Sequence, residues 1–182
     1  MKVALLAALA MPISLTLAQA QTPPLAPWGL GIEDVIVVIV PPSIRSQLGD
    51  LEYEDTDSVR GVAVDLNGDG VKDYVIQAAP SLCGNGGCPY VLFDGATGKE
   101  LGQVSGSPLF VRAEKAHGYP IVDTYSHLSA ESGTLTTYTF DGTAYVVSSA
   151  RTAQGASLDS LIVALRRIPL WRPRSSPRHR RG

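Results

Sequence analysis

One short stretch of the chain places oxygen-bearing side chains at alternate positions and then closes with a further aspartate. It reads Asp65-Leu66-Asn67-Gly68-Asp69-Gly70-Val71-Lys72-Asp73. Ca²⁺ is a hard cation that binds six to eight oxygens, and alternate acidic or amide side chains in a tight turn direct their oxygens inward. Gly70 permits the sharp bend. The pattern therefore predicts a Ca²⁺ site whose ligands are Asp65, Asn67, Asp69, the Val71 carbonyl and Asp73, with an ordinary solvated turn as the alternative.

The segments that flank this motif favour strands rather than helices. Arg60 to Val64 precede it and Tyr74 to Ile76 follow it, and an EF-hand would need Glu where the chain has Ile76. We therefore expect the loop to join two strands of a β-hairpin. Residues 61–76 resemble the FG-GAP cation loop of integrin α-chain propellers and bacterial repeat proteins, and the resemblance implies structural calcium at the five positions named above. The chain has one copy, whereas a propeller needs several.

Two cysteines, Cys83 and Cys88, enclose a flexible Gly-Asn-Gly-Gly loop. Their C-x4-C spacing differs from the C-x-x-C of redox folds, and two thiolates without a nearby histidine make a poor zinc site. We expect a disulfide that contributes about 2 kcal/mol. A metal or redox pair is the alternative.

The first twenty residues have the features of an export signal. Lys2 supplies a positive start, an apolar run extends from Val3 to Leu17, and Ala18-Gln19-Ala20 has the small-x-small cleavage pattern. The run is too short to span a bilayer. These features predict a signal peptide over 1–20, a periplasmic or extracellular protein, and no transmembrane segment in the mature chain. An oxidising compartment also favours the disulfide.

Charge is distributed very unevenly along the chain. Residues 21–165 contain all 17 acidic residues and seven basic ones, a net charge of −10, whereas 166–182 contain seven arginines and no acid. An acidic body repels nucleic acid, so no nucleic-acid binding is expected. Residues 169–182 are expected to be a disordered tail, which could bind an envelope polyanion or an extracytoplasmic protein.

The elements that must position these residues are mainly strands. The chain of 182 residues contains 18 Gly and 13 Pro, which suits short strands and many turns. We expect an extended lead-in over 21–31 and a single domain over 32–168. Strands are expected at 32–40, where a short helix is the alternative, and at 60–64, 74–78, 89–93, 100–104, 108–112, 119–125, 134–140 and 143–149. Helical turns are expected at 43–48 and a C-terminal helix at 158–168, where Leu158, Leu161, Ile162 and Leu165 form one stripe. The fold class is therefore mainly β, as an antiparallel meander, sandwich or small barrel, with α+β as the alternative.

Other polar residues give weaker signals. Asp123, Ser126 and His127 invite a hydrolase interpretation, but the chain lacks a G-x-S-x-G elbow. His117 and His127 with Asp123 could bind zinc, although ordinary surface histidines are the simpler interpretation. The favoured function is a secreted or periplasmic, calcium-stabilised binding protein without a recognisable catalytic set. The alternatives are an extracytoplasmic hydrolase that uses Asp123, His127 or the acidic residues Glu52, Glu54, Asp55 and Asp57, and a lysozyme-inhibitor-like protein, the latter by analogy of size and location alone.

Overall fold

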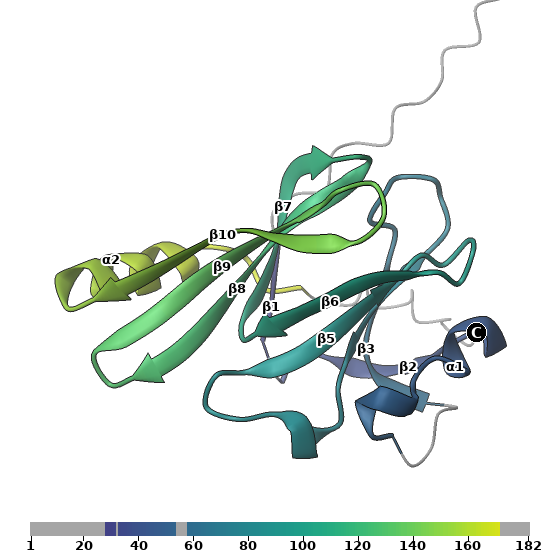
Figure 1. Cartoon of the computed structure of the whole chain (residues 1–182), viewed down its shortest axis with the longest axis horizontal. Coiled ribbons are helices and arrows are strands. Elements are labelled where there is room, and N and C mark those ends of the chain that lie inside the picture. The colour runs from purple at the N-terminus through teal and green to yellow at the C-terminus, as the bar shows by residue number, and fades with distance from the viewer. Residues whose placement is uncertain (1–27, 32, 54–57, 172–182) are drawn as a thin grey trace, which may run out of the picture.

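A computed structural model of the chain describes residues 28–31, 33–53 and 58–171 (Figure 1). The predicted signal peptide, the first part of the lead-in and the last eleven residues lie outside this part. The described residues form two five-stranded antiparallel sheets and a C-terminal helix, with short helical segments elsewhere. This confirms the predicted mainly β fold with a C-terminal helix. The two sheets do not close into a barrel.

The first sheet, which we call sheet B, is a simple meander. Its strands pair in the order in which they occur in the chain: β2 (Ile36–Ile39), β3 (Ser58–Val64), β4 (Asp73–Gln77), β5 (Cys88–Phe93) and β6 (Glu100–Gly106). The β3–β4 pair has Val64 opposite Asp73, so the acidic motif lies between two paired strands as predicted. A short 3-10 helix, η2 (Pro80–Leu82), lies between β4 and β5.

The second sheet, sheet A, combines the two ends of the described chain. Its order is β1 (Trp28–Leu30), β7 (Leu109–Ala116), β8 (Tyr119–Ser129), β9 (Ser132–Phe140) and β10 (Tyr145–Gln154). Asp141 begins the β9–β10 turn, and its carboxylate accepts hydrogen bonds from the N–H groups of Thr143 and Ala144. Strand β1 falls within the predicted lead-in, where three residues are too few to show a strand pattern.

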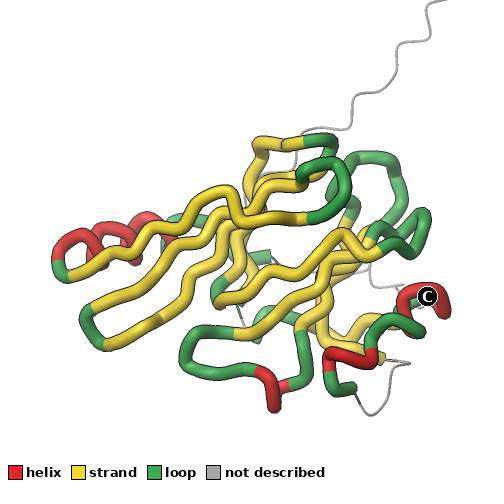
Figure 2. Tube along the Cα trace, viewed as in Figure 1, coloured by secondary structure: helices red, strands yellow, loops and turns green. Residues whose placement is uncertain are grey.

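The main core lies between the two sheets, and every strand except β2 contributes to it. Its largest fully buried side chains are Leu30, Leu66, Tyr90, Leu92, Leu101 and Leu109. Burial of one such side chain stabilises the fold by about 1.5–3 kcal/mol. The helices lie at the periphery and the strands occupy the middle of the molecule (Figure 2).

Helical segments cover the outer faces of both sheets. Helix α1 (Pro42–Arg45) and the 3-10 helix η1 (Gly49–Leu51) pack on sheet B, where Ile44 and Leu48 are fully buried. Helix α2 (Ala156–Leu165) packs on sheet A through the predicted stripe, in which Leu158 and Leu161 are buried and Ile162 and Leu165 are half-buried. It starts two residues before the predicted helix and ends three residues earlier.

The segment after α2 corrects the predicted start of the tail. Pro169 accepts a hydrogen bond from the Gly29 N–H at 2.8 Å, and the Trp171 N–H donates to the Gly29 carbonyl at 2.7 Å. Trp171 is half-buried against the main core. Because β7 pairs with only one edge of β1, the other edge offers free backbone groups that residues 169–171 use. These residues belong to the folded domain, as do residues 28–31 of the lead-in.

Candidate metal-binding site

The acidic loop between β3 and β4 is organised by hydrogen bonds from its own backbone. The Asp65 carboxylate accepts the N–H groups of Gly68 at 2.6 Å and Gly70 at 2.9 Å. Both glycines have a positive φ, 90° and 88°, which side-chain-bearing residues rarely adopt. The bend predicted at Gly70 is therefore present, and it folds the chain back over Asp65.

Asn67 and Asp69 repeat this arrangement along the loop. Asn67 Oδ1 accepts the Asp69 N–H at 2.9 Å, and Asp69 Oδ1 accepts the Val71 N–H at 2.7 Å. The Asn67 amide also donates to Asp69 Oδ2 at 2.9 Å. The oxygens of Asp65, Asn67 and Asp69 are thus held against one short loop, and each retains a lone pair after accepting a single hydrogen bond.

Asp73, the last residue of the motif, is the first residue of β4 and is fully buried. Its carboxylate accepts the N–H of Leu66 at 2.8 Å and the N–H of Gly95 at 3.0 Å. Burial raises the pKa of Asp73, although these backbone hydrogen bonds oppose the increase. In the part of the chain that the structure describes, no lysine or arginine forms an ion pair with it. Asp73 is therefore a buried acid without a side-chain counter-charge.

The sequence analysis missed three residues next to this loop: Asp94, Lys115 and Tyr119. Tyr119 of β8 donates its hydroxyl hydrogen to Asp94 at 2.6 Å and lies 3.3 Å from the Asn67 amide nitrogen. The Lys115 ammonium group donates to the Asn67 carbonyl at 2.7 Å. Sheet A thereby contacts the loop of sheet B. Asp94 could have been predicted from the sequence, because an antiparallel meander places the end of β5 beside the start of β4. Lys115 and Tyr119 lie in the other sheet, so no local sequence pattern indicates that they contact the loop.

These contacts shift the pKa values of both Tyr119 and Asp94. Burial, reinforced by the bond to Asp94, raises the pKa of Tyr119 well above its usual range. Burial opposes ionisation of Asp94, but hydrogen bonds from Tyr119 and Thr97 together lower its pKa. Asp94 is therefore an ionised carboxylate close enough to Asp73 to oppose ionisation of Asp73.

The donor chemistry of the loop fits Ca²⁺, because every predicted ligand is a carboxylate, amide or carbonyl oxygen. The predicted ligand side chains do not all converge on one point. No three histidine, cysteine or carboxylate side chains among the described residues converge into a metal-binding group. The loop gathers Asp65, Asn67 and Asp69, whereas Asp73 faces the backbone of Leu66 and Gly95.

The predicted disulfide between Cys83 and Cys88 is present, with the two Cα atoms 4.3 Å apart. Inside the enclosed loop, Gly84 and Gly87 exchange two backbone hydrogen bonds of 2.9 Å. A side chain at Gly87 would collide with the backbone of Gly106 and Ser107. The bridge therefore holds a tight turn against the end of β6.

The residues of the hydrolase alternative are not brought together. The Asp123 carboxylate accepts two hydrogen bonds from Arg112, at 2.5 and 2.8 Å, and one from Thr137 at 2.7 Å. Ser126 and His127 are consecutive in β8, so their side chains point to opposite faces of the sheet. His127 lies about 13 Å along the strand from Asp123.

The remaining candidate groups are also apart. His117 lies in the β7–β8 turn, at the end of β8 opposite His127, which does not favour a shared zinc site. Glu52 accepts a hydrogen bond from Ser81, and residues 54–57 lie outside the described part of the chain.

The fold and this loop define an antiparallel two-sheet protein with an oxygen-rich hairpin at the junction of its sheets. No protein-family model, curated protein or solved structure matches the chain. Among the described residues, no helix has the length and apolar character that a membrane crossing needs.

Proposed function

We propose that the chain is an exported binding protein whose fold Ca²⁺ stabilises through the 65–73 loop. The observation that supports this most directly is Asp73, a fully buried acid with no side-chain cation beside it in the described residues and with Asp94 nearby. A buried charge destabilises a fold unless an opposite charge accompanies it. Ca²⁺ would supply that charge, held by Asp65, Asn67, Asp69, the Val71 carbonyl and Asp73.

Two further observations support export. The first twenty residues have the composition of a signal peptide, and the Cys83–Cys88 bridge is of the kind that persists in oxidising compartments. Intact-mass measurement of the secreted protein tests both points. We expect a chain that begins at Gln21 and has no thiol that labels before reduction.

The calcium proposal is tested by thermal unfolding of the purified protein in EGTA and at increasing Ca²⁺, with Mg²⁺ as the comparison ion. A Kd near 10⁻⁴ M is ordinary for an extracellular module. At 100 times Kd the stabilisation is about 2.7 kcal/mol, or roughly 6–10 °C in Tm for a domain of this size. An unchanged Tm on chelation would contradict the proposal.

Matched variants locate the effect. Asp69→Ala should abolish most of the calcium response, because it removes a carboxylate at the centre of the motif. Asp141→Ala is the control, since Asp141 also lies in an Asp-Gly turn and also accepts backbone N–H groups, but lies outside the motif. The Asp141 variant should keep the full calcium response.

A further inference from the structure

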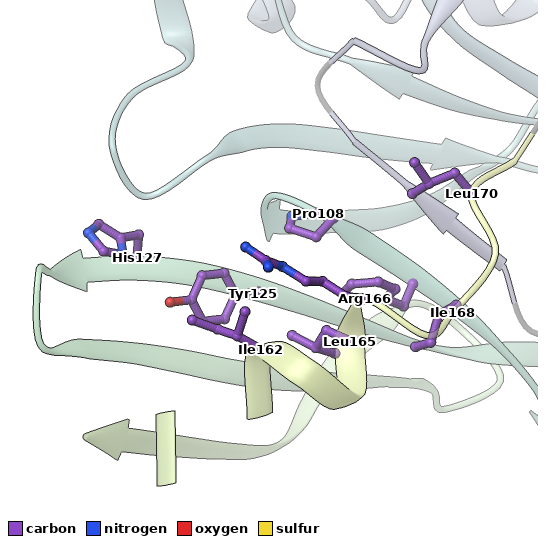
Figure 3. Close-up of a pocket in the computed structure, with 9 residues that line it drawn as sticks. Pro108, Tyr125, His127, Ile162, Leu165, Arg166, Ile168 and Leu170 are labelled. Atoms are coloured by element: carbon purple, nitrogen blue, oxygen red, sulfur yellow. The ribbon is translucent and has the colours of Figure 1, made fainter. Parts of the chain in front are cut away.

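A cavity of about 400 Å³ lies on the outer face of sheet A, between strands β7 and β8 and the end of α2 (Figure 3). This volume is within the range of small-molecule sites in proteins. The cavity is separate from the acidic loop of sheet B, so nothing in the following argument depends on calcium.

Most of the wall is apolar and comes from segments far apart in the chain. Phe110 belongs to β7, Ile162 and Leu165 to α2, and Ile168 and Leu170 to the segment after the helix. The hydrogen bonds of Pro169 and Trp171 to Gly29 fix that last segment against β1. The apolar end of the cavity is therefore held in place by backbone contacts.

The cavity also contains a buried polar group without a partner. Tyr125 is 9% exposed, and its hydroxyl makes no hydrogen bond within the described part of the chain. The hydroxyl end of the ring lies over Gly133, where a Cβ would collide with the hydroxyl oxygen. A buried hydroxyl without a partner is unfavourable, so a ligand oxygen that accepts its hydrogen would stabilise it.

A positively charged side chain, that of Arg166, lies at the end of the cavity that contains Tyr125. Figure 3 shows that the Arg166 side chain extends toward the end of the cavity where Tyr125 and His127 lie. Ile168 and Leu170 lie at the opposite end. In the described residues the Arg166 guanidinium group forms no ion pair or hydrogen bond. The next residue, Arg167, is also an arginine, and the sequence has no acidic residue after Asp159. The polar end of the cavity therefore suits a negative group.

We propose that this cavity binds a fatty acid. The acyl chain lies among Ile162, Leu165 and Ile168, where it removes apolar surface from water. The carboxylate pairs with Arg166, and the Tyr125 side chain turns from its buried position over Gly133 to donate its hydroxyl hydrogen to one of the carboxylate oxygens. A charge-assisted hydrogen bond of this kind is stronger than a neutral one, so the site distinguishes an acid from the corresponding alcohol.

The test is isothermal titration of the full chain with dodecanoate below its micellar concentration, with dodecanol as the uncharged comparison. We expect dodecanoate to bind with one site and dodecanol to bind at least tenfold more weakly. Arg166→Gln should weaken dodecanoate at least tenfold. Arg167→Gln is the matched control, because Arg167 carries the same charge on the next residue but does not line the cavity; its effect should be within twofold.

A second variant tests the hydroxyl. Tyr125→Phe should weaken dodecanoate several-fold without lowering the Tm of the ligand-free protein, because the hydroxyl has no partner to lose. Absence of dodecanoate binding, equal binding of the acid and the alcohol, or equal losses in the Arg166 and Arg167 variants would each overturn the proposal. The titration is performed once in EGTA and once in Ca²⁺, and dodecanoate should bind equally well in both. The result therefore tests the cavity independently of the calcium proposal.

Discussion

The two sheets each bury one aspartate, and the groups that surround the two carboxylates differ. In sheet A, Asp123 receives two hydrogen bonds from the Arg112 guanidinium group and one from Thr137, so a neighbouring strand supplies its counter-charge. In sheet B, Asp73 receives backbone N–H groups, among them those of Leu66 and Gly95, and no side-chain cation among the described residues pairs with it. Backbone N–H groups stabilise a carboxylate with partial charge alone, whereas a guanidinium group carries a full one.

This difference indicates what each region requires from its surroundings. Sheet A is electrostatically complete at Asp123, so changes in the solution should not affect it strongly. Sheet B gathers several acids around one loop, and its stability should depend on cations that the solution provides. The following predictions are ordered from the largest expected effect to the smallest.

Removal of the internal counter-charge should have the largest effect. Arg112→Met leaves Asp123 buried without a cation, which costs about 3 kcal/mol, at the lower end of the range for broken buried pairs because the Arg112 side chain is 39% exposed. Urea denaturation measures this loss, which should be the same with and without Ca²⁺. Arg151→Met, which changes an exposed arginine in β10, should cost less than about 0.5 kcal/mol. Equal effects of the two variants would contradict the comparison.

Removal of the charge on Asp73, the buried acid that has no side-chain counter-charge in the described part of the chain, should instead abolish the calcium response. Asp73→Asn removes the charge and sets an NH2 group against one of the N–H groups of Leu66 and Gly95, so the protein should be less stable in EGTA. The gain of about 2.7 kcal/mol at 100 times Kd should also be lost. The measurement is the Tm difference between EGTA and saturating Ca²⁺. Asp123→Asn is the control and should keep that difference, although it destabilises the protein. If both variants respond to Ca²⁺ as the unmodified protein does, Asp73 is not a ligand.

Truncation tests how much residues 169–171, which bind the outer edge of β1, contribute to the stability of sheet A. A chain that ends at Ile168 loses the two hydrogen bonds to Gly29, worth about 1 kcal/mol each, and the apolar contact of Trp171. We expect a loss of about 2.5 kcal/mol, of which the two hydrogen bonds account for most. A chain that ends at Trp171 should match the full chain within about 0.5 kcal/mol, because the sequence predicts a tail of solvated charges, which contribute little to stability. Equal stability of the two truncated chains would show that residues 169–171 do not stabilise the fold.

Loss of the disulfide should have the smallest effect. The Cys83–Cys88 bridge closes a short loop, so its reduction removes about 2 kcal/mol. Chemical denaturation with and without a reductant measures this. The calcium response should persist in the reduced protein, since the bridge lies at the start of β5 and Asp94 follows the end of that strand. Loss of the response on reduction would show that the two turns are coupled.

Short-range patterns in the sequence determined much of sheet B and the helices. The acidic motif predicted a loop between paired strands, the cysteine spacing predicted the bridge, and the apolar stripe predicted α2 packed through Leu158 and Leu161. The strands predicted at 134–140 and 143–149 likewise correspond to β9 and β10, which pair with each other. These features depend on residues a few positions apart, whose geometry the local backbone sets.

Only the tertiary structure decided which distant segments meet. Strand β1 pairs with β7 across about eighty residues, Pro169 and Trp171 bind Gly29, and Tyr119 reaches Asp94 from the opposite sheet. The cavity beside Tyr125 also exists only because α2 and the segment after it fold onto β7 and β8. Periodicity shows that a strand has a buried face, but it does not show which strand or helix covers that face. That choice depends on the combined burial and hydrogen bonding of the whole chain, so no local pattern contains it.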